Sequence, residues 1–154
     1  MNLLFQQFKV ILPLASKWVE EQERIILQEG EALSAQGLED ARLMGVTYPE
    51  QVRLLQVESI PLPSNPILKA AAVSTGLISQ NTGGMSLRYG IFLRTDCWEN
   101  REIIAHECVH TAQYERFGSV KSFLQHYLEE CITIGYPDAP LEQEAITKAA
   151  EINF

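Results

Sequence analysis

Two histidines and a glutamate stand close together in the stretch "HECVH", which covers residues 106–110. On a helix, side chains four positions apart project from the same face, so His106 and His110 can reach one metal ion. Glu107 follows the first histidine, and its carboxylate would lie beside the metal, where it can accept a proton from a metal-bound water. The spacing therefore predicts a zinc site that activates water for attack on a carbonyl group.

The alternative is that both histidines are ordinary residues on one side of a helix. Apolar residues surround the motif, so the helix is expected to be largely buried, and buried histidines and glutamates need polar or metal partners. The chain contains only 3 histidines, and two of them belong to this motif. These observations favour the metal site. The apolar neighbours are Ile103, Ile104, Ala105, Val109 and Ala112.

Catalytic zinc usually takes three protein ligands and leaves one position open, so another element must supply a third ligand. Acidic residues downstream of the motif are the candidates. Glu115 lies five residues beyond His110 on the motif helix itself and is expected to point elsewhere. The remaining candidates are Glu129, Glu130, Asp138, Glu142, Glu144 and Glu151.

The last predicted helix begins at Pro140 and covers "PLEQEAITKAAEI". Spacing of 100° per residue places Glu142 within the apolar stripe of this helix and Glu144 beyond its edge. A carboxylate on a buried face needs a counter-charge, and zinc supplies one. Glu142 is therefore the favoured third ligand, with Glu144 as the alternative. The stripe consists of Leu141, Ala145, Ala149 and Ile152.

Helices and strands that could position these residues follow from the hydrophobic periodicity and the turn signals. The order is helices, then a small antiparallel sheet, then helices, which predicts the α+β class. The expected hairpin has its turn at "NTGG", residues 81–84, and the motif helix is expected to begin at Asp96 and to end at Gly118. Expected helices cover about 14–36, 38–45, 66–74, 96–118, 119–134 and 140–152, a strand covers 51–57, and the hairpin covers 76–94.

Length and composition predict one domain over residues 1–154, with an N-terminal helical region at 1–45, the sheet at 51–94 and the metal-site helices at 96–154. The chain has 12 Lys+Arg against 20 Asp+Glu and a net charge of −8, which argues against nucleic-acid and anionic-membrane partners. No segment reads as a signal peptide or a transmembrane helix. The 3 cysteines form no pairing framework, so the cytoplasm is the expected compartment.

The stretch "HECVH" followed by "PLEQEA" resembles the gluzincin metallopeptidases, the thermolysin-like clan. In that clan a small residue commonly stands three positions after the ligand glutamate and an aspartate four positions after it. Glu142 is followed by Ala145, which matches, and by Ile146, which departs from the pattern; Glu144 matches less well. Further stretches, "YPEQVRLL", "IPLPSNPIL", "RYGIFLR" and "GYPDAPLEQEA", resemble small bacterial HExxH proteins with a minimal gluzincin core.

The resemblance implies a zincin-like domain in which His106, His110 and a glutamate of the last helix hold Zn²⁺ and Glu107 is the general base. It implies a zinc metallopeptidase acting on a peptide or protein substrate. Strand "RYGIFLR" at 88–94 would then pair with the extended substrate, and the alternative is an ordinary edge strand. The alternative function is a non-catalytic, zinc-stabilised interaction or accessory protein.

An oxyanion-stabilising donor is also expected beside the zinc. Tyr136 is favoured for this role because it lies in the loop before the last helix, and His126 and Tyr114 are alternatives.

Overall fold

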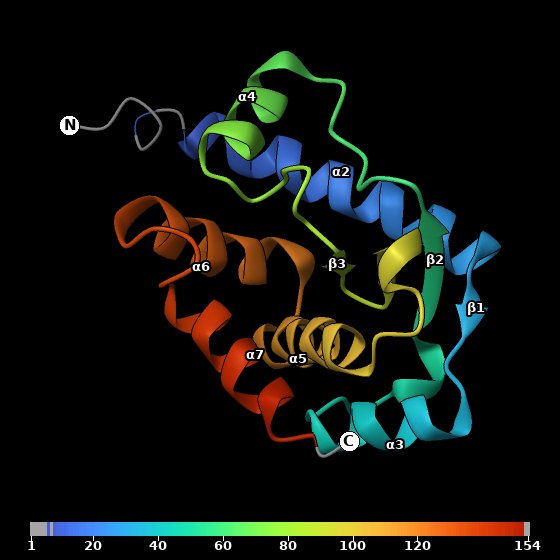
Figure 1. Ribbon diagram of the computed structural model, residues 1–154. Helices are drawn as coiled ribbons and strands as arrows, with labels where there is room; N and C mark the ends of the chain where they lie inside the picture. Colours follow the sequence, from blue (N-terminus) through green and yellow to red (C-terminus); the bar gives the residue numbers. More distant parts are fainter. Residues whose placement is uncertain (1–5, 7, 153–154) are drawn as a thin grey trace.

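The computed structural model describes residues 6 and 8–152, and its β-sheet is mixed rather than antiparallel. Within the described residues the strand order is β1–β2–β4–β3 (Figure 1). β2 and β4 are parallel, whereas β1 pairs with β2 and β3 pairs with β4 in antiparallel fashion. The α+β class is thus confirmed, but the antiparallel sheet is wrong. The strands are β1 (Glu31–Ala32), β2 (Arg53–Val57), β3 (Gly84–Leu87) and β4 (Gly90–Arg94).

Helices cover both faces of this sheet. In Figure 1, α2 and α4 lie above the sheet and α5 and α7 lie below it, with α6 beside β3. The parallel pairing of β2 with β4 requires a crossover, which contains α4. The helices are α2 (Phe8–Glu29), α3 (Ala35–Leu43), α4 (Pro66–Ser74), α5 (Arg101–Phe117), α6 (Val120–Thr133) and α7 (Pro140–Ala150).

β4 is buried on both faces, which explains its continuous apolar sequence. Phe92 packs into a buried cluster with residues of α2 and α6, whereas Ile91 and Leu93 pack into a cluster with residues of α3, α5 and α7. This alternation follows from the two-residue period of side chains along a strand. The central strand therefore joins the layer of α2 and α6 to the layer that carries the metal-site helices.

The helix expected over residues 14–36 ends earlier than predicted, and a short strand separates it from the next helix. α2 ends at Glu29, and β1 pairs with β2 through Glu31 and Leu54. The chain passes so close to its neighbours at Gly30 that a Cβ there would lie 2.7 Å from Ile26 O and 2.8 Å from Leu54 O. Gly37 lies inside α3, whose first turn is capped by Ser34. The periodicity of the apolar residues did not reveal this close approach.

The hairpin turn also differs from the expectation, because it lies at Arg88 and Tyr89 rather than at "NTGG". Arg88 has a positive φ of 65°. Its guanidinium donates to both carboxylate oxygens of Glu23 on α2, at 2.9 and 2.8 Å, and Tyr89 N donates to Glu23 Oε2 at 3.0 Å. The buried Glu23 carboxylate thus holds the turn, and a contact between residues so distant in sequence leaves no local turn signal.

None of the described helices combines the length and the apolar character that crossing a bilayer would require.

Candidate metal centre

α5 carries the "HECVH" residues in its middle turns. Asn100 caps the helix by accepting a hydrogen bond from Ile103 N at 3.0 Å, and Gly118 ends it with a φ of 89°. The expected start at Asp96 is wrong, because α5 begins at Arg101 and the Asp96 carboxylate accepts a hydrogen bond from Arg94 Nε at 2.6 Å. The expected end at Gly118 is confirmed.

The side chains of His106, His110 and Glu142 meet between α5 and α7. His106 Nε2 lies 2.7 Å from Glu142 Oε1, and His110 Nε2 lies 3.1 Å from Glu142 Oε2. One ligand atom from each of the three residues lies within 4.8 Å of the others. The residues expected to hold a metal ion are therefore gathered at one point of the fold.

This geometry fits a zinc ion. Zinc–nitrogen and zinc–oxygen bonds of about 2.0–2.2 Å in a tetrahedron hold neighbouring donor atoms a little over 3 Å apart. The contacts that Glu142 makes with the two imidazoles, at 2.7 and 3.1 Å, need only a small spreading of the side chains to admit the ion. Two neutral imidazoles and one carboxylate are also the donor set of several catalytic zinc sites.

α7 places Glu142 in this cluster and directs Glu144 away from it. The expected stripe of Leu141, Ala145 and Ala149 is buried, and Glu142, at 3% exposure, is buried with it. Pro140 opens the helix, and Leu141 N donates to the Glu130 carboxylate at 2.9 Å. The Glu130 carboxylate thus accepts a backbone N–H in the first turn of α7 and does not join the cluster of His106, His110 and Glu142.

Glu144, the alternative ligand, makes other contacts. Its Oε1 accepts hydrogen bonds from Gln113 Nε2 at 2.7 Å and from Arg116 Nη2 at 2.9 Å. Glu115 accepts from Thr47 N, Tyr48 N and Tyr89 Oη, so it points elsewhere, as expected. Three further acidic candidates are exposed and lie outside the cluster: Glu129, Asp138 and Glu151.

Gln113 is a site residue that the sequence reasoning missed. It is fully buried, and its Oε1 lies 2.8 Å from His110 Nδ1. Its Nε2 donates to Leu141 O at 2.9 Å, so Oε1 must be the acceptor and His110 Nδ1 must carry a proton. The signal was a polar residue three positions after His110 on a helix expected to be buried.

The charges in the cluster shift its pKa values strongly. Burial alone would lower the pKa of His110, but the contact with Glu142 and the charge of Glu107 outweigh burial and raise this pKa to about 9. Burial likewise opposes the ionisation of Glu142, yet its contacts with His106 and His110 bring its pKa well below the usual range. Glu142 is therefore an anionic partner for cations at this point.

Glu107 lies next to the cluster, on the side of β3. It is 7% exposed, and burial raises its pKa against the opposing effect of the His106 and His110 charges. A Cβ at position 84 would lie 3.1 Å from Glu107 Cγ, so the absence of a side chain at Gly84 lets β3 approach this carboxylate closely. A carboxylate with a raised pKa is a stronger base than usual, which suits proton transfer.

Tyrosines surround the cluster. Tyr127 Oη donates to Glu142 Oε2 at 2.9 Å, a contact that the sequence reasoning did not foresee. Tyr136, the expected oxyanion donor, is 39% exposed and lines the same cavity, and burial together with the charges of Glu142 and Glu107 raises its pKa. Tyr114 also lines the cavity, whereas His126 is exposed and stacks on Phe117.

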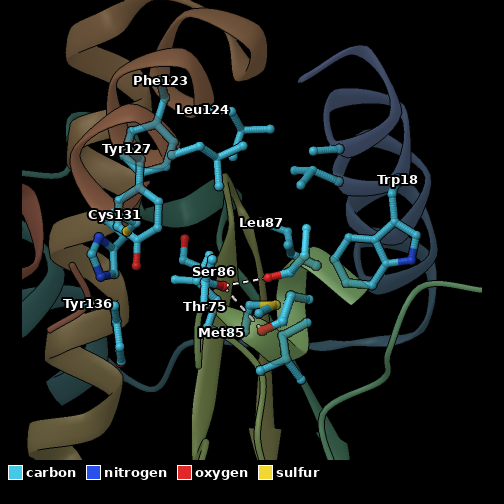
Figure 2. Close-up of a pocket in the computed structure, with 18 of the residues that line it drawn as sticks. Trp18, Thr75, Met85, Ser86, Leu87, Phe123, Leu124, Tyr127, Cys131 and Tyr136 are labelled. Atoms are coloured by element: carbon cyan, nitrogen blue, oxygen red, sulfur yellow. Dashed lines mark hydrogen bonds between the residues drawn. The ribbon is translucent and has the colours of Figure 1, made fainter. Parts of the chain in front are cut away.

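A cavity of about 160 Å³ reaches the cluster and lies between α6, β3, α2 and α4. Figure 2 shows Tyr127, Cys131 and Tyr136 on one side of it and Trp18 on the other, with Met85 and Leu87 of β3 between them. His106, Glu107, His110 and Glu142 all belong to the lining, so a small molecule can reach the polar cluster through the cavity.

Strand pairing corrects the expectation for "RYGIFLR". Within the described residues β4, the strand of that stretch, is paired on both sides, with β2 and with β3, and has no edge for a peptide. Among the residues that the structure describes, β3 pairs with β4 alone, and it lines the cavity. The sheet edge next to the metal cluster is therefore Gly84–Leu87.

Compared with known proteins, the chain matches no family model, no curated protein and no solved structure, so a function for this centre has to be argued from its geometry and chemistry.

Proposed function

We propose that this protein is a zinc-dependent hydrolase of the zincin-like type that cleaves peptide bonds. The observation that carries the proposal is the meeting of His106, His110 and Glu142 at one end of a cavity, with Glu107 beside them. When bound, zinc supplies Lewis-acid chemistry, because it lowers the pKa of a coordinated water towards neutrality and polarises the carbonyl of the substrate.

Each residue of the chain has a distinct task in this proposal. His106, His110 and Glu142 hold the metal. Gln113 orients the imidazole of His110 so that His110 Nε2 faces Glu142. Glu107 takes a proton from the attacking water and later delivers it to the leaving amine. Tyr136 lines the cavity, and its hydroxyl donates a hydrogen bond to the developing oxyanion.

The outer edge of β3, which pairs with no second strand within the described residues, supports a peptide as the substrate. An extended peptide can pair with an unpartnered strand through its main chain, and the β3 edge runs past Glu107. Such pairing would bring successive peptide carbonyl groups close to the metal cluster. The substrate is therefore expected to bind as an extended segment.

Replacing Glu107 by glutamine tests the proposal. Glu107→Gln keeps the shape of the side chain but cannot accept the proton, so turnover of a peptide library should fall by about a hundredfold or more. Zinc content should stay equal to that of the unaltered protein. Glu102→Gln, an exposed position on the same helix, is the matched control and should retain full turnover.

The non-catalytic alternative predicts a different outcome. A zinc-stabilised interaction module would bind zinc stoichiometrically, and neither the unaltered protein nor Glu107→Gln would turn over peptides. Its zinc content would be the same in both proteins. The cavity that reaches the cluster favours the hydrolase, because a purely structural zinc site is closed to solvent molecules and substrates.

A further inference from the structure

The wall of the cavity away from the metal cluster is apolar. α2 contributes Ile11, Ala15, Trp18 and Val19, which lie at helical spacing and form one face of that helix. α6 contributes the facing wall, as Figure 2 shows for Phe123, Leu124, Tyr127 and Cys131 opposite Trp18.

The threonine and serine hydroxyls that line the cavity are engaged within the protein. Thr75 Oγ1 donates to Ala71 O at 2.7 Å, Thr82 Oγ1 accepts from Ser79 N at 2.9 Å, and Ser86 Oγ bonds to Thr111 Oγ1 at 3.2 Å. A peptide unit buried here would leave its N–H and C=O without partners, which is costly. An uninterrupted apolar group is the ligand that suits such a wall.

The residues that line the cavity extend along two helices. Its lining on α2 runs from Ile11 to Val19, and eight residues of α-helix span about 12 Å. The lining on α6 runs from Phe123 to Ile132 and is of similar length. An enclosed apolar cavity of about 150 Å³ holds a benzene molecule, so the 160 Å³ here corresponds to about six carbon atoms, with room at its open end for more. Neither a leucine nor a phenylalanine side chain extends over this length.

From these observations we infer that the substrate carries a straight aliphatic chain on the scissile amide, and that this chain occupies the apolar channel between α2, α4 and α6. The cleavage of an amide bond rests on the proposed function, whereas the binding of an aliphatic chain in the channel does not. Water adds across the amide C–N bond, so that the carbonyl carbon leaves as a carboxylate and the nitrogen leaves as a protonated amine. An N-acyl group and an N-alkyl group share the required chain chemistry.

Binding of straight-chain carboxylates from butanoate to dodecanoate tests the channel without any turnover. Titration calorimetry on the zinc-loaded full chain should show affinity rising about fourfold per methylene, as expected for burial of an apolar chain, with a plateau between hexanoate and decanoate. Affinity that is independent of chain length would overturn the inference. Tighter binding of phenylpropanoate than of octanoate would overturn it too, because it would indicate a pocket for one aromatic side chain.

A matched pair of variants on α4 locates the chain. Ala72 lines the channel and Ala70 is exposed on the same helix. Ala72→Phe should weaken octanoate binding about tenfold or more, which equals about two lost methylenes, and should leave butanoate unaffected. Ala70→Phe should bind the whole series as the unaltered protein does. Equal octanoate affinity in both variants would overturn the inference, and the chain-length series decides alone if Ala72→Phe does not fold.

Hydrolysis assays identify the side of the amide that carries the chain. A rise of kcat/KM along a series of N-acyl peptides assigns the chain to the carbonyl side, and a rise along a series of peptide N-alkylamides assigns it to the amine side. Hydrolysis whose kcat/KM rises in neither series overturns the inference. Affinity that depends on chain length, in the absence of any hydrolysis, would reject the proposed function and support the channel. Hydrolysis that depends on Glu107, together with an affinity independent of chain length, would support the proposed function and reject the channel.

Discussion

His110 and Gln113 form a hydrogen bond of 2.8 Å between Nδ1 and Oε1, in a place where both side chains are buried. Gln113 also donates to Leu141 O and to Glu144, both on α7. One amide therefore orients an imidazole of α5 and ties α5 to the start of the helix that carries Glu142.

Replacing Gln113 by leucine should weaken zinc binding. His110 would lose the acceptor for its Nδ1–H, and loss of such a partner typically costs 10- to 100-fold, or about 1–3 kcal/mol, in metal affinity. Competition with a chromophoric chelator measures the change. Unaltered zinc affinity in Gln113→Leu would show that this hydrogen bond does not position the ligand.

Gln113→Glu separates the two roles of the amide. The carboxylate still accepts from His110 Nδ1 but cannot donate to Leu141 O or to Glu144. We expect near-normal zinc affinity but a loss of about 1–3 kcal/mol in the free energy of unfolding of the metal-free protein. Urea unfolding measures this loss, and a variant as stable as the unaltered protein would speak against the tie between α5 and α7.

Zinc affinity should rise with pH. Because the pKa of His110 is raised to about 9 in the metal-free protein, zinc must displace a proton from it below that pH. The affinity is therefore expected to increase about tenfold per pH unit between about pH 7 and pH 9 and to level off above. Calorimetry in buffers of different ionisation heat should show a released proton; affinity that is constant over this range would contradict the expectation.

Stability of the metal-free protein should change with pH in the opposite direction. The folded pKa of His110, about 9, lies above the usual 6.5, so its protonation stabilises the fold. This contribution is complete below about pH 6.5 and is lost as the pH rises through about 9. Thermal unfolding should show a lower midpoint at high pH, a trend that weakens in His110→Ala. A midpoint that rises with pH over this range would refute the assignment.

The two tyrosines of the site should respond differently to loss of their hydroxyls. Tyr127→Phe removes the donor to Glu142 Oε2 and should weaken zinc binding, since this ligand loses a partner that orients it. Tyr136→Phe should keep the zinc affinity and lower kcat by about a hundredfold if its hydroxyl stabilises the oxyanion. Equal zinc affinities in the two variants would show that Tyr127 does not orient Glu142. A normal kcat in Tyr136→Phe would show that Tyr136 does not stabilise the oxyanion.

Arg88 should stabilise the hairpin turn through its contact with Glu23. Removing the guanidinium leaves a carboxylate of 4% exposure with Tyr89 N as its remaining partner, so Arg88→Ala should cost about 3 kcal/mol or more. Arg88→Gly loses the same ion pair but tolerates the φ of 65°, and should be about 1 kcal/mol more stable than Arg88→Ala. Equal stabilities of the two variants would show that the turn conformation carries no cost.

Local sequence signals predicted the helices of the site better than the sheet. Helical spacing predicted that His106 and His110 share one face, and the apolar stripe of α7 favoured Glu142 over Glu144. In the structure Glu142 is buried and lies beside both histidines, whereas Glu144 contacts Gln113 and Arg116. The mixed sheet could not be predicted in this way, because the parallel pairing of β2 with β4 depends on a crossover that has no local signature.

Contacts between distant segments account for the misplaced features. The turn at Arg88 depends on Glu23, the break at Gly30 depends on β2, and the orientation of Gln113 depends on Leu141 O. In each case the feature depends on a contact with another helix or strand. The polar side chains Glu23 and Gln113 gave only a weak sequence signal, namely a polar residue within an otherwise apolar helix face.

The central claim is that His106, His110 and Glu142 together hold one zinc ion, and metal analysis of two matched variants tests it most directly. Glu142→Gln and Glu144→Gln make the same change two positions apart on α7. After dialysis against a weak chelator, we expect one equivalent of zinc in the unaltered protein and in Glu144→Gln, and little in Glu142→Gln. Equal zinc content in both variants, or none in the unaltered protein, would contradict the account.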